Sequence, residues 1–156
     1  MSGDPYCYCA IKGAVQKAAL SFFMPTVALV VDDSMLIRYT VCRFLEERGF
    51  LVESATNGVE ALQALSRVRP DLIVTDMQMP KMSGTELITA LKSKPETATI
   101  PIIIVAGRGS GFDESEKRAN FAIYKDIDVE GQLGKALEAL QNKAENQRSL
   151  GKGAGK

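Results

Sequence analysis

Aspartates and one lysine are the residues of this 156-residue chain whose positions suggest chemistry. Asp32 and Asp33 directly follow one short apolar run, Asp76 follows a second, and Lys125 ends a third. The chain contains no histidine, so His-based catalytic triads, His-ligated zinc and a phosphohistidine on this chain are excluded. Any chemistry must therefore use carboxylates and lysine.

The apolar runs before these residues are expected to be parallel strands, and ligands of a doubly wound sheet bind beyond the carboxyl ends of its strands. Three carboxylates at one edge repel each other, and a divalent cation that prefers hard oxygen ligands, Mg2+, would bridge them. Asp76 can then attack a phosphoryl donor while Lys125 pairs with a phosphoryl oxygen. The expected product is an acyl phosphate on Asp76.

Each of these residues also has a purely structural interpretation. Asp33 and Ser34 can cap the helix that follows them. A lysine at a strand end, such as Lys125, is most often simply solvated. The joint placement of the aspartates and the lysine is what favours a functional site.

The elements that must position these residues alternate along the chain. Short apolar runs, expected as strands covered on both faces, are separated by amphipathic stretches, which is typical of a parallel sheet with crossover helices. The fourth helix is expected to be short and mobile, because a glycine-rich segment precedes it. The expected strands are 27–31, 51–55, 72–75, 102–106 and 121–125. The first expected helix is capped by Ser34 and stops at Gly49. The second follows a turn at Asn57-Gly58, includes Val68 and is terminated by Pro70. The other three are expected at 85–92, at about 113–120 and through 133–140.

Length and composition indicate one domain. The chain is 46% hydrophobic and 24% charged, close to the globular norm. We expect the domain to cover residues 25–145. Residues 1–24 are interpreted as an N-terminal extension, either a short amphipathic helix or sequence upstream of a start at Met24, and residues 146–156 as a disordered tail.

Charge and cysteine content indicate which cellular location and which classes of partner to expect. Nineteen Lys and Arg residues balance nineteen Asp and Glu residues, which disfavours direct binding to nucleic acid. No uninterrupted apolar stretch approaches about 18 residues, so no membrane association is expected. Three cysteines, at 7, 9 and 42, form no disulfide framework, and we expect a cytoplasmic location.

The chain carries VVDDS at residues 30–34, DMQMPKMSG at 76–84 and a lysine at 125. Together these features resemble the response regulator receiver domain of two-component signalling. The resemblance spans about residues 25–140 and is to single-domain, chemotaxis-regulator-like members. It implies an α/β fold of the flavodoxin-like, doubly wound type, with five parallel strands in the order 2-1-3-4-5 and five helices.

The resemblance also implies roles for individual residues. Asp76 would be the phosphoacceptor, and Lys125 would bind the phosphoryl group. Mg2+ would be held by Asp32, Asp33, Asp76 and the backbone carbonyl of Gln78. The donor would be a histidine kinase or a phosphotransfer protein. Such a domain catalyses only its own phosphorylation and dephosphorylation, so we do not expect an enzyme that acts on other substrates.

Three positions depart from the family pattern. Ala106 stands where receivers usually have Thr or Ser, and Ala122 where they commonly have a switching aromatic residue. Asp126 replaces a proline that usually follows the lysine through a cis bond; a cis bond here would cost about 2.5 to 4 kcal/mol, so we expect a rearranged or strained loop. The hydroxyl bond missing at Ala106 is worth roughly 1.5 to 3 kcal/mol. We therefore expect phosphorylation to persist with a weaker or redirected conformational response.

Three functions compete at this point. The leading one is a stand-alone receiver, phosphorylated at Asp76, that acts on a partner protein. The alternative is a degenerate receiver that serves as a phosphorylation-independent interaction module, which Ala106 and Asp126 favour. A phosphatase of the haloacid dehalogenase type also uses an Asp nucleophile, but it requires a second Asp two residues later, where Gln78 stands.

Overall fold

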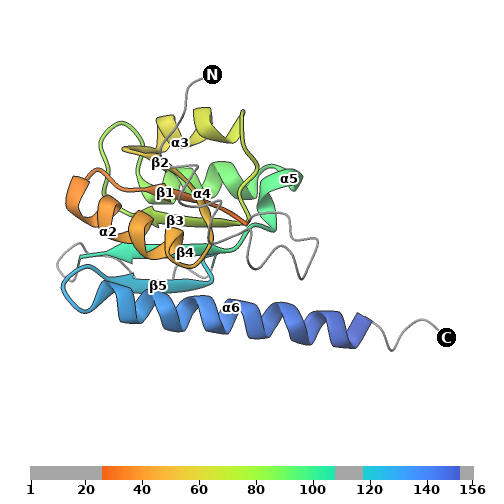
Figure 1. Cartoon of the computed structure of the whole chain (residues 1–156). Helices are drawn as coiled ribbons and strands as arrows, with labels where there is room; N and C mark the ends of the chain where they lie inside the picture. The colour runs from red at the N-terminus through yellow and green to blue at the C-terminus, as the bar shows by residue number, and fades with distance from the viewer. Residues whose placement is uncertain (1–25, 108–117, 152–156) are drawn as a thin grey trace, which may run out of the picture.

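The computed structural model describes residues 26–107 and 118–151, in which five strands form one parallel sheet. The strand order is β2-β1-β3-β4-β5 (Figure 1). The predicted flavodoxin-like, doubly wound arrangement is therefore confirmed. The strands are β1 (Val27–Val31), β2 (Leu51–Ala55), β3 (Leu72–Asp76), β4 (Ile102–Ala106) and β5 (Phe121–Tyr124).

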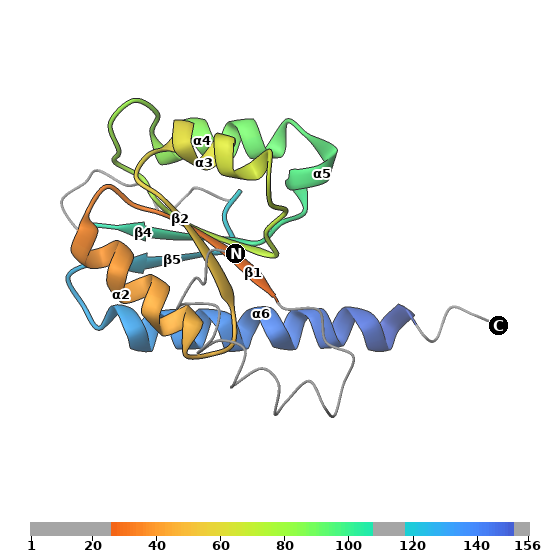
Figure 2. The ribbon, with the colours of Figure 1, turned by 45° about the horizontal axis from the view of Figure 1, so that its top comes forward.

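Five helices within the described residues cover the two faces of the sheet. Helices α2 (Met35–Glu46) and α6 (Val129–Gly151) lie on one face, and α3 (Gly58–Leu65), α4 (Gly84–Lys92) and α5 (Pro95–Ala98) lie on the other (Figure 2). None of the helices in the described ranges is both long enough and apolar enough to span a bilayer.

Alternate strand residues enter two separate hydrophobic clusters, one on each face. In β1, Ala28 and Val30 join the cluster under α2 and α6, while Leu29 and Val31 join the cluster under α3 and α4. All five residues of β4 are buried. This double coverage explains why the central strands read as continuous apolar runs, because side chains on both faces leave water.

Side-chain caps begin the helices that surround the site. Ser34 caps α2, and Ser83 forms a reciprocal capping box with Glu86 at the start of α4. Asn57 and Gly58 were expected to form a turn; instead Asn57 is the N-cap of α3, its side chain accepting the Glu60 N–H at 3.0 Å, and Gly58 is the first helical residue. In this position the Asn57 side chain satisfies one of the N–H groups that the first turn of a helix leaves without an intrahelical partner.

Several predicted boundaries were wrong. Helix α3 ends at Leu65, short of Val68, and β5 ends one residue before Lys125. Helix α5 was not predicted; it is a single turn with Pro95 in its first positions, too short for apolar periodicity to reveal.

The C-terminal end differs from the prediction over residues 146–151. Helix α6 continues to Gly151, so residues 146–151 are helical rather than disordered, in line with the good helix formers at 143–145. The proposed extension at 1–24 lies outside the described residues. So does most of the expected helix at 113–120, and its last three residues form a turn and a bend.

Candidate phosphoacceptor site

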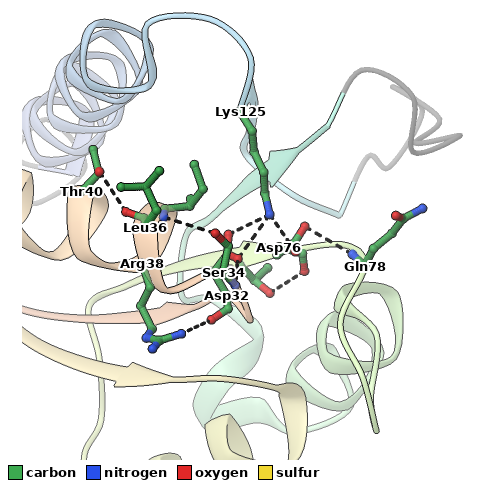
Figure 3. Close-up of polar contacts among 10 residues, drawn as sticks. Asp32, Ser34, Leu36, Arg38, Thr40, Asp76, Gln78 and Lys125 are labelled. Atoms are coloured by element: carbon green, nitrogen blue, oxygen red, sulfur yellow. Dashed lines mark hydrogen bonds and ion pairs between the residues drawn. The ribbon is translucent and has the colours of Figure 1, made fainter.

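The predicted site residues come together at the carboxyl edge of the sheet. Asp32 follows β1, Asp76 is the last residue of β3, and Lys125 directly follows β5. All strands are parallel, so these ends lie on the same edge, and Figure 3 shows Lys125 reaching over β4 toward both aspartates. The convergence follows from the topology, because no two of these residues are near one another in sequence.

The Lys125 ammonium bridges the two buried aspartates. Its Nζ lies 2.9 Å from Asp76 Oδ2 and 3.0 Å from Asp32 Oδ2, and it also donates to Asp32 Oδ1 at 3.2 Å. Burial by itself lowers the pKa of Lys125, but the hydrogen bonds to Asp76 and Asp32 outweigh it, and the pKa lies above its usual value. The lysine is therefore held as a cation at neutral pH.

Asp32 is buried in an environment that disfavours its charge. Only 2% of its surface is exposed. Burial raises the pKa of Asp32 above its usual value, and the charge of Asp76 adds to the rise. The Ser34 N–H, which donates to Asp32 Oδ1 at 2.8 Å, and Lys125 counter only part of this effect.

The three aspartates form a cluster whose geometry fits a divalent cation. One carboxylate oxygen from each of Asp32, Asp33 and Asp76 lies within 4.8 Å of the others. Asp32 and Asp76 are buried, while Asp33 is exposed to solvent. Asp32 Oδ2 is buried and accepts no hydrogen bond of good geometry, although the Lys125 ammonium lies beside it. Carboxylate oxygens are ligands that Mg2+ prefers, and the under-satisfied Asp32 Oδ2 is available to such an ion, so the residues fit Mg2+.

The loop after β3 holds Asp76 from the backbone. In this loop the Gln78 N–H donates to Asp76 Oδ1 at 3.3 Å. From β3 itself, the Thr75 hydroxyl donates to the Asp76 carbonyl at 2.9 Å. Gly84 packs against this segment and donates its N–H to the Met77 carbonyl at 3.0 Å. A Cβ at Gly84 would collide with the Asp76 carbonyl oxygen, which explains the glycine at the end of the DMQMPKMSG motif.

The same loop contains a tight turn at Lys81. Lys81 has a φ of 67°, in the left-handed region, and the Met82 N–H donates to the Pro80 carbonyl at 2.7 Å across it. Such a three-residue turn is strained for a residue with a Cβ. It reverses the chain between the Asp76 segment and the start of α4.

The departures from the family pattern lie beside the cluster. Ala106 ends β4, the strand between Asp76 and Lys125, and is fully buried, so this strand end presents a methyl group and no hydroxyl. The Lys125 N–H donates to the Ala106 carbonyl at 3.0 Å. Every peptide bond in the described ranges is trans, including the one between Lys125 and Asp126.

Sequence reasoning missed one contact of the cluster. Arg38, in the second turn of α2, donates from Nη1 to the Asp32 carbonyl at 2.8 Å. The only signal was an arginine placed six residues after the first aspartate. Since arginines on exposed helix faces are common, that spacing alone does not identify a contact.

The class of protein follows from this fold and from the family comparison. The response regulator receiver domain family matches residues 28–139, which is most of the chain. The sheet order and the acidic cluster at its carboxyl edge agree with that match. The chain belongs to the response regulator receiver domain family.

Three known proteins illustrate the similarity. The phosphate regulon transcriptional regulatory protein PhoB of Rhizobium meliloti is 38% identical over 106 residues, which cover 66% of this chain and 44% of PhoB. The receiver domain of a signal transduction histidine kinase from Syntrophus aciditrophicus superposes with a TM-score of 0.66 at 32% identity, covering 76% of this chain and 91% of that one. The chemotaxis response regulator CheY4 of Vibrio cholerae gives a TM-score of 0.64 at 29% identity, covering 76% and 98%. The chain spans less than half the length of the curated relatives that it matches first.

Proposed function

We propose that this receiver domain accepts a phosphoryl group on Asp76 in a Mg2+-dependent reaction and signals through protein–protein contacts. The observation that carries the proposal is the bridging position of Lys125, whose Nζ lies 2.9 Å from Asp76 Oδ2 inside a cluster of three aspartates. A cation beside the nucleophile and a cluster suited to a second cation can neutralise an incoming phosphoryl group.

Asp76 is the nucleophile in this proposal. The donor in this step is a phosphohistidine of the kinase or phosphotransfer protein. One Asp76 carboxylate oxygen forms a bond to phosphorus while the bond between phosphorus and the histidine nitrogen breaks, and the imidazole leaves with the electron pair of that bond. The Gln78 N–H at 3.3 Å from Oδ1 orients the carboxylate. The Lys125 ammonium can pair with an oxygen of the transferred group, because it already lies against the carboxylate that receives it.

The metal ligands in this proposal are Asp32, Asp33, Asp76 and the backbone carbonyl of Gln78. Mg2+, when bound, supplies positive charge to the phosphoryl oxygens as the negative charge accumulates. The buried Asp32 carboxylate anchors the site, and the exposed Asp33 carboxylate lies at its open side. Asp32 Oδ2, which lacks a hydrogen bond of good geometry, would be available to the ion.

The phosphoryl donor in this proposal is a histidine kinase or a phosphotransfer protein. These 156 residues contain no histidine, so the phosphohistidine must lie outside them. The phosphorylated domain then acts by contact with a further protein. Added negative charge on Asp76 changes the pairing of Lys125, and this is the electrostatic event that a partner would detect.

The test is the intact mass of the protein after incubation with acetyl phosphate and Mg2+. We expect a labile gain of one phosphoryl group that disappears in EDTA and in Asp76→Asn. Asp71→Asn is the matched control, because Asp71 lies at the opposite end of β3, where it accepts the Val27 N–H. This variant should gain the phosphoryl group as the wild type does.

The alternative function is a receiver that acts as a fixed interaction module. The buried methyl group of Ala106, at a strand end where receivers usually carry a hydroxyl, favours it. If the wild type gains no phosphoryl group while a conventional receiver does so in parallel, phosphoryl acceptance is refuted and this alternative takes its place.

A further inference from the structure

Arg38 connects helix α2 to the backbone that carries two of the clustered aspartates. Its Nη1 donates a 2.8 Å hydrogen bond to the carbonyl of Asp32. Figure 3 shows the guanidinium on the opposite side of Asp32 from Lys125. The contact is made to the peptide carbonyl, not to the Asp32 carboxylate, so the guanidinium leaves the carboxylate oxygens available.

The Asp32 carbonyl belongs to the planar peptide that joins Asp32 to Asp33. Its orientation therefore helps to set the directions in which the two carboxylates leave the backbone. Two other contacts restrain the same segment: the Asp32 N–H donates to the Ala55 carbonyl at 3.1 Å, and the Ser34 N–H donates to Asp32 Oδ1 at 2.8 Å. Both use backbone donors, so the Arg38 bond is the one of these three contacts that a substitution can remove without altering the Asp32 carboxylate.

The restraint matters because the carboxylates of the cluster repel one another. Asp32, Asp33 and Asp76 bring carboxylate oxygens within 4.8 Å of one another. Mutual repulsion favours conformations in which the exposed Asp33 side chain swings away. A peptide held in one orientation reduces that freedom, and a metal site gains affinity when its ligands are held in place before the ion binds.

We propose that Arg38 is a positioning residue for the divalent-cation site: its bond to the Asp32 carbonyl holds the Asp32–Asp33 peptide so that both carboxylates converge with that of Asp76. This inference rests on the proposed function, since it takes the cluster to be a Mg2+ site. Arg38 touches neither the phosphoryl group nor the ion and acts only through the backbone.

The sign of the effect separates positioning from simple electrostatics. Arg38 is a cation near an acidic site, so if its charge alone mattered, its removal would strengthen the binding of Mg2+. Loss of positioning weakens that binding instead. Removing a group that orients a metal ligand typically weakens metal binding by 10- to 100-fold, and because Arg38 is only partly buried we expect about tenfold.

The experiment is titration calorimetry of Mg2+ into the full chain, without a phosphoryl donor. Arg38→Met removes the donor and keeps an apolar stem, and Arg38→Lys keeps both a charge and a donor. Arg48→Met is the matched control: Arg48 lies just beyond the other end of α2 and donates from Nη1 to the Phe44 carbonyl at 3.2 Å. We expect about tenfold weaker binding for Arg38→Met, a smaller loss for Arg38→Lys and wild-type binding for Arg48→Met.

Each other outcome overturns the inference. If the wild type binds Mg2+ and Arg38→Met binds it equally well or more tightly, positioning is wrong while the proposed function stands. An equal loss in Arg48→Met would show a general effect on α2. If the wild type binds no Mg2+, the proposed function fails and the inference fails with it. Circular dichroism in EDTA verifies folding, and Arg38→Gln, whose side chain is too short to span the same gap, replaces Arg38→Met if that variant is unfolded.

Discussion

Replacing Lys125 with methionine should destabilise the metal-free protein. The ammonium lies 3.0 Å from Asp32 Oδ2 and 2.9 Å from Asp76 Oδ2, and only 19% of the lysine side chain is exposed. Methionine retains most of the apolar stem but none of the charge. Two buried carboxylates then face each other with no cation between them.

The magnitude follows from the spacing of the carboxylates. Their oxygens lie within 4.8 Å of one another, and at that distance and an effective dielectric constant of about 20, two unit charges repel by about 3.5 kcal/mol. Breaking a buried ion pair by removing one partner costs roughly 3 to 5 kcal/mol. We therefore expect Lys125→Met to lower the free energy of unfolding by about 3 kcal/mol at neutral pH. Mg2+ should restore much of the loss, because it replaces the missing charge.

Urea unfolding, followed by circular dichroism in EDTA and again in saturating Mg2+, measures both effects. Lys135→Met is the control, since Lys135 is an exposed lysine on α6 and its loss should change stability little. A loss of less than about 1 kcal/mol in EDTA, the scale of a surface ion pair, would refute the reasoning. A loss that Mg2+ leaves unchanged would also refute it, because the cause would then be packing and not charge.

Four other positions have measurable consequences. Burial raises the pKa of Asp32 above 3.8. In EDTA, the free energy of unfolding of the wild type relative to that of Asp32→Asn should therefore be greatest at acid pH and fall as the pH rises through the raised pKa. A difference between the two proteins that does not change with pH would contradict this. Gly84→Ala places a Cβ against the backbone at the end of β3 and should lower the free energy of unfolding in urea by about 1 to 3 kcal/mol. Gly107→Ala should lower it little, because a Cβ at Gly107 meets no atom of the described residues within contact distance. Burial raises the pKa of Cys42 to about 11 from 9.0. In a variant whose two N-terminal cysteines are serines, alkylation of Cys42 near neutral pH should therefore be about 100-fold slower in the folded protein than in urea. Equal alkylation rates would contradict this. Ala106→Thr should show larger amide chemical-shift changes on phosphorylation than Ala106→Val, which has a similar shape without the hydroxyl; equal changes would show that the hydroxyl is unimportant.

The sheet was predictable because its signal is local. Residues 102–106 read IIIVA, and all five are buried, as a strand covered on both faces requires. The ends of the elements were less predictable, because they depend on capping and packing that apolar periodicity does not encode. Asn57 became a helix cap instead of a turn residue, and Pro95 began a single helical turn.

The sequence by itself determined which residue types stand at the carboxyl ends of the strands. The aspartates at 32, 33 and 76 and the lysine at 125 are each placed by the apolar run before them. A parallel sheet brings the carboxyl ends of its strands to one edge whatever loops connect them. The convergence of these residues was therefore predictable from the order of the elements, before any interatomic distance was known.

Only the tertiary structure decided how these residues pair. Lys125 meets Asp32 across 93 positions of sequence, Arg38 reaches the Asp32 carbonyl and not its carboxylate, and Gly84 lies against the end of β3. Each contact depends on where a helix or loop packs on the sheet and on which rotamer that packing permits. Local sequence patterns set the elements and the chemical groups at their ends, but the distances between those groups arise only when the whole core is assembled.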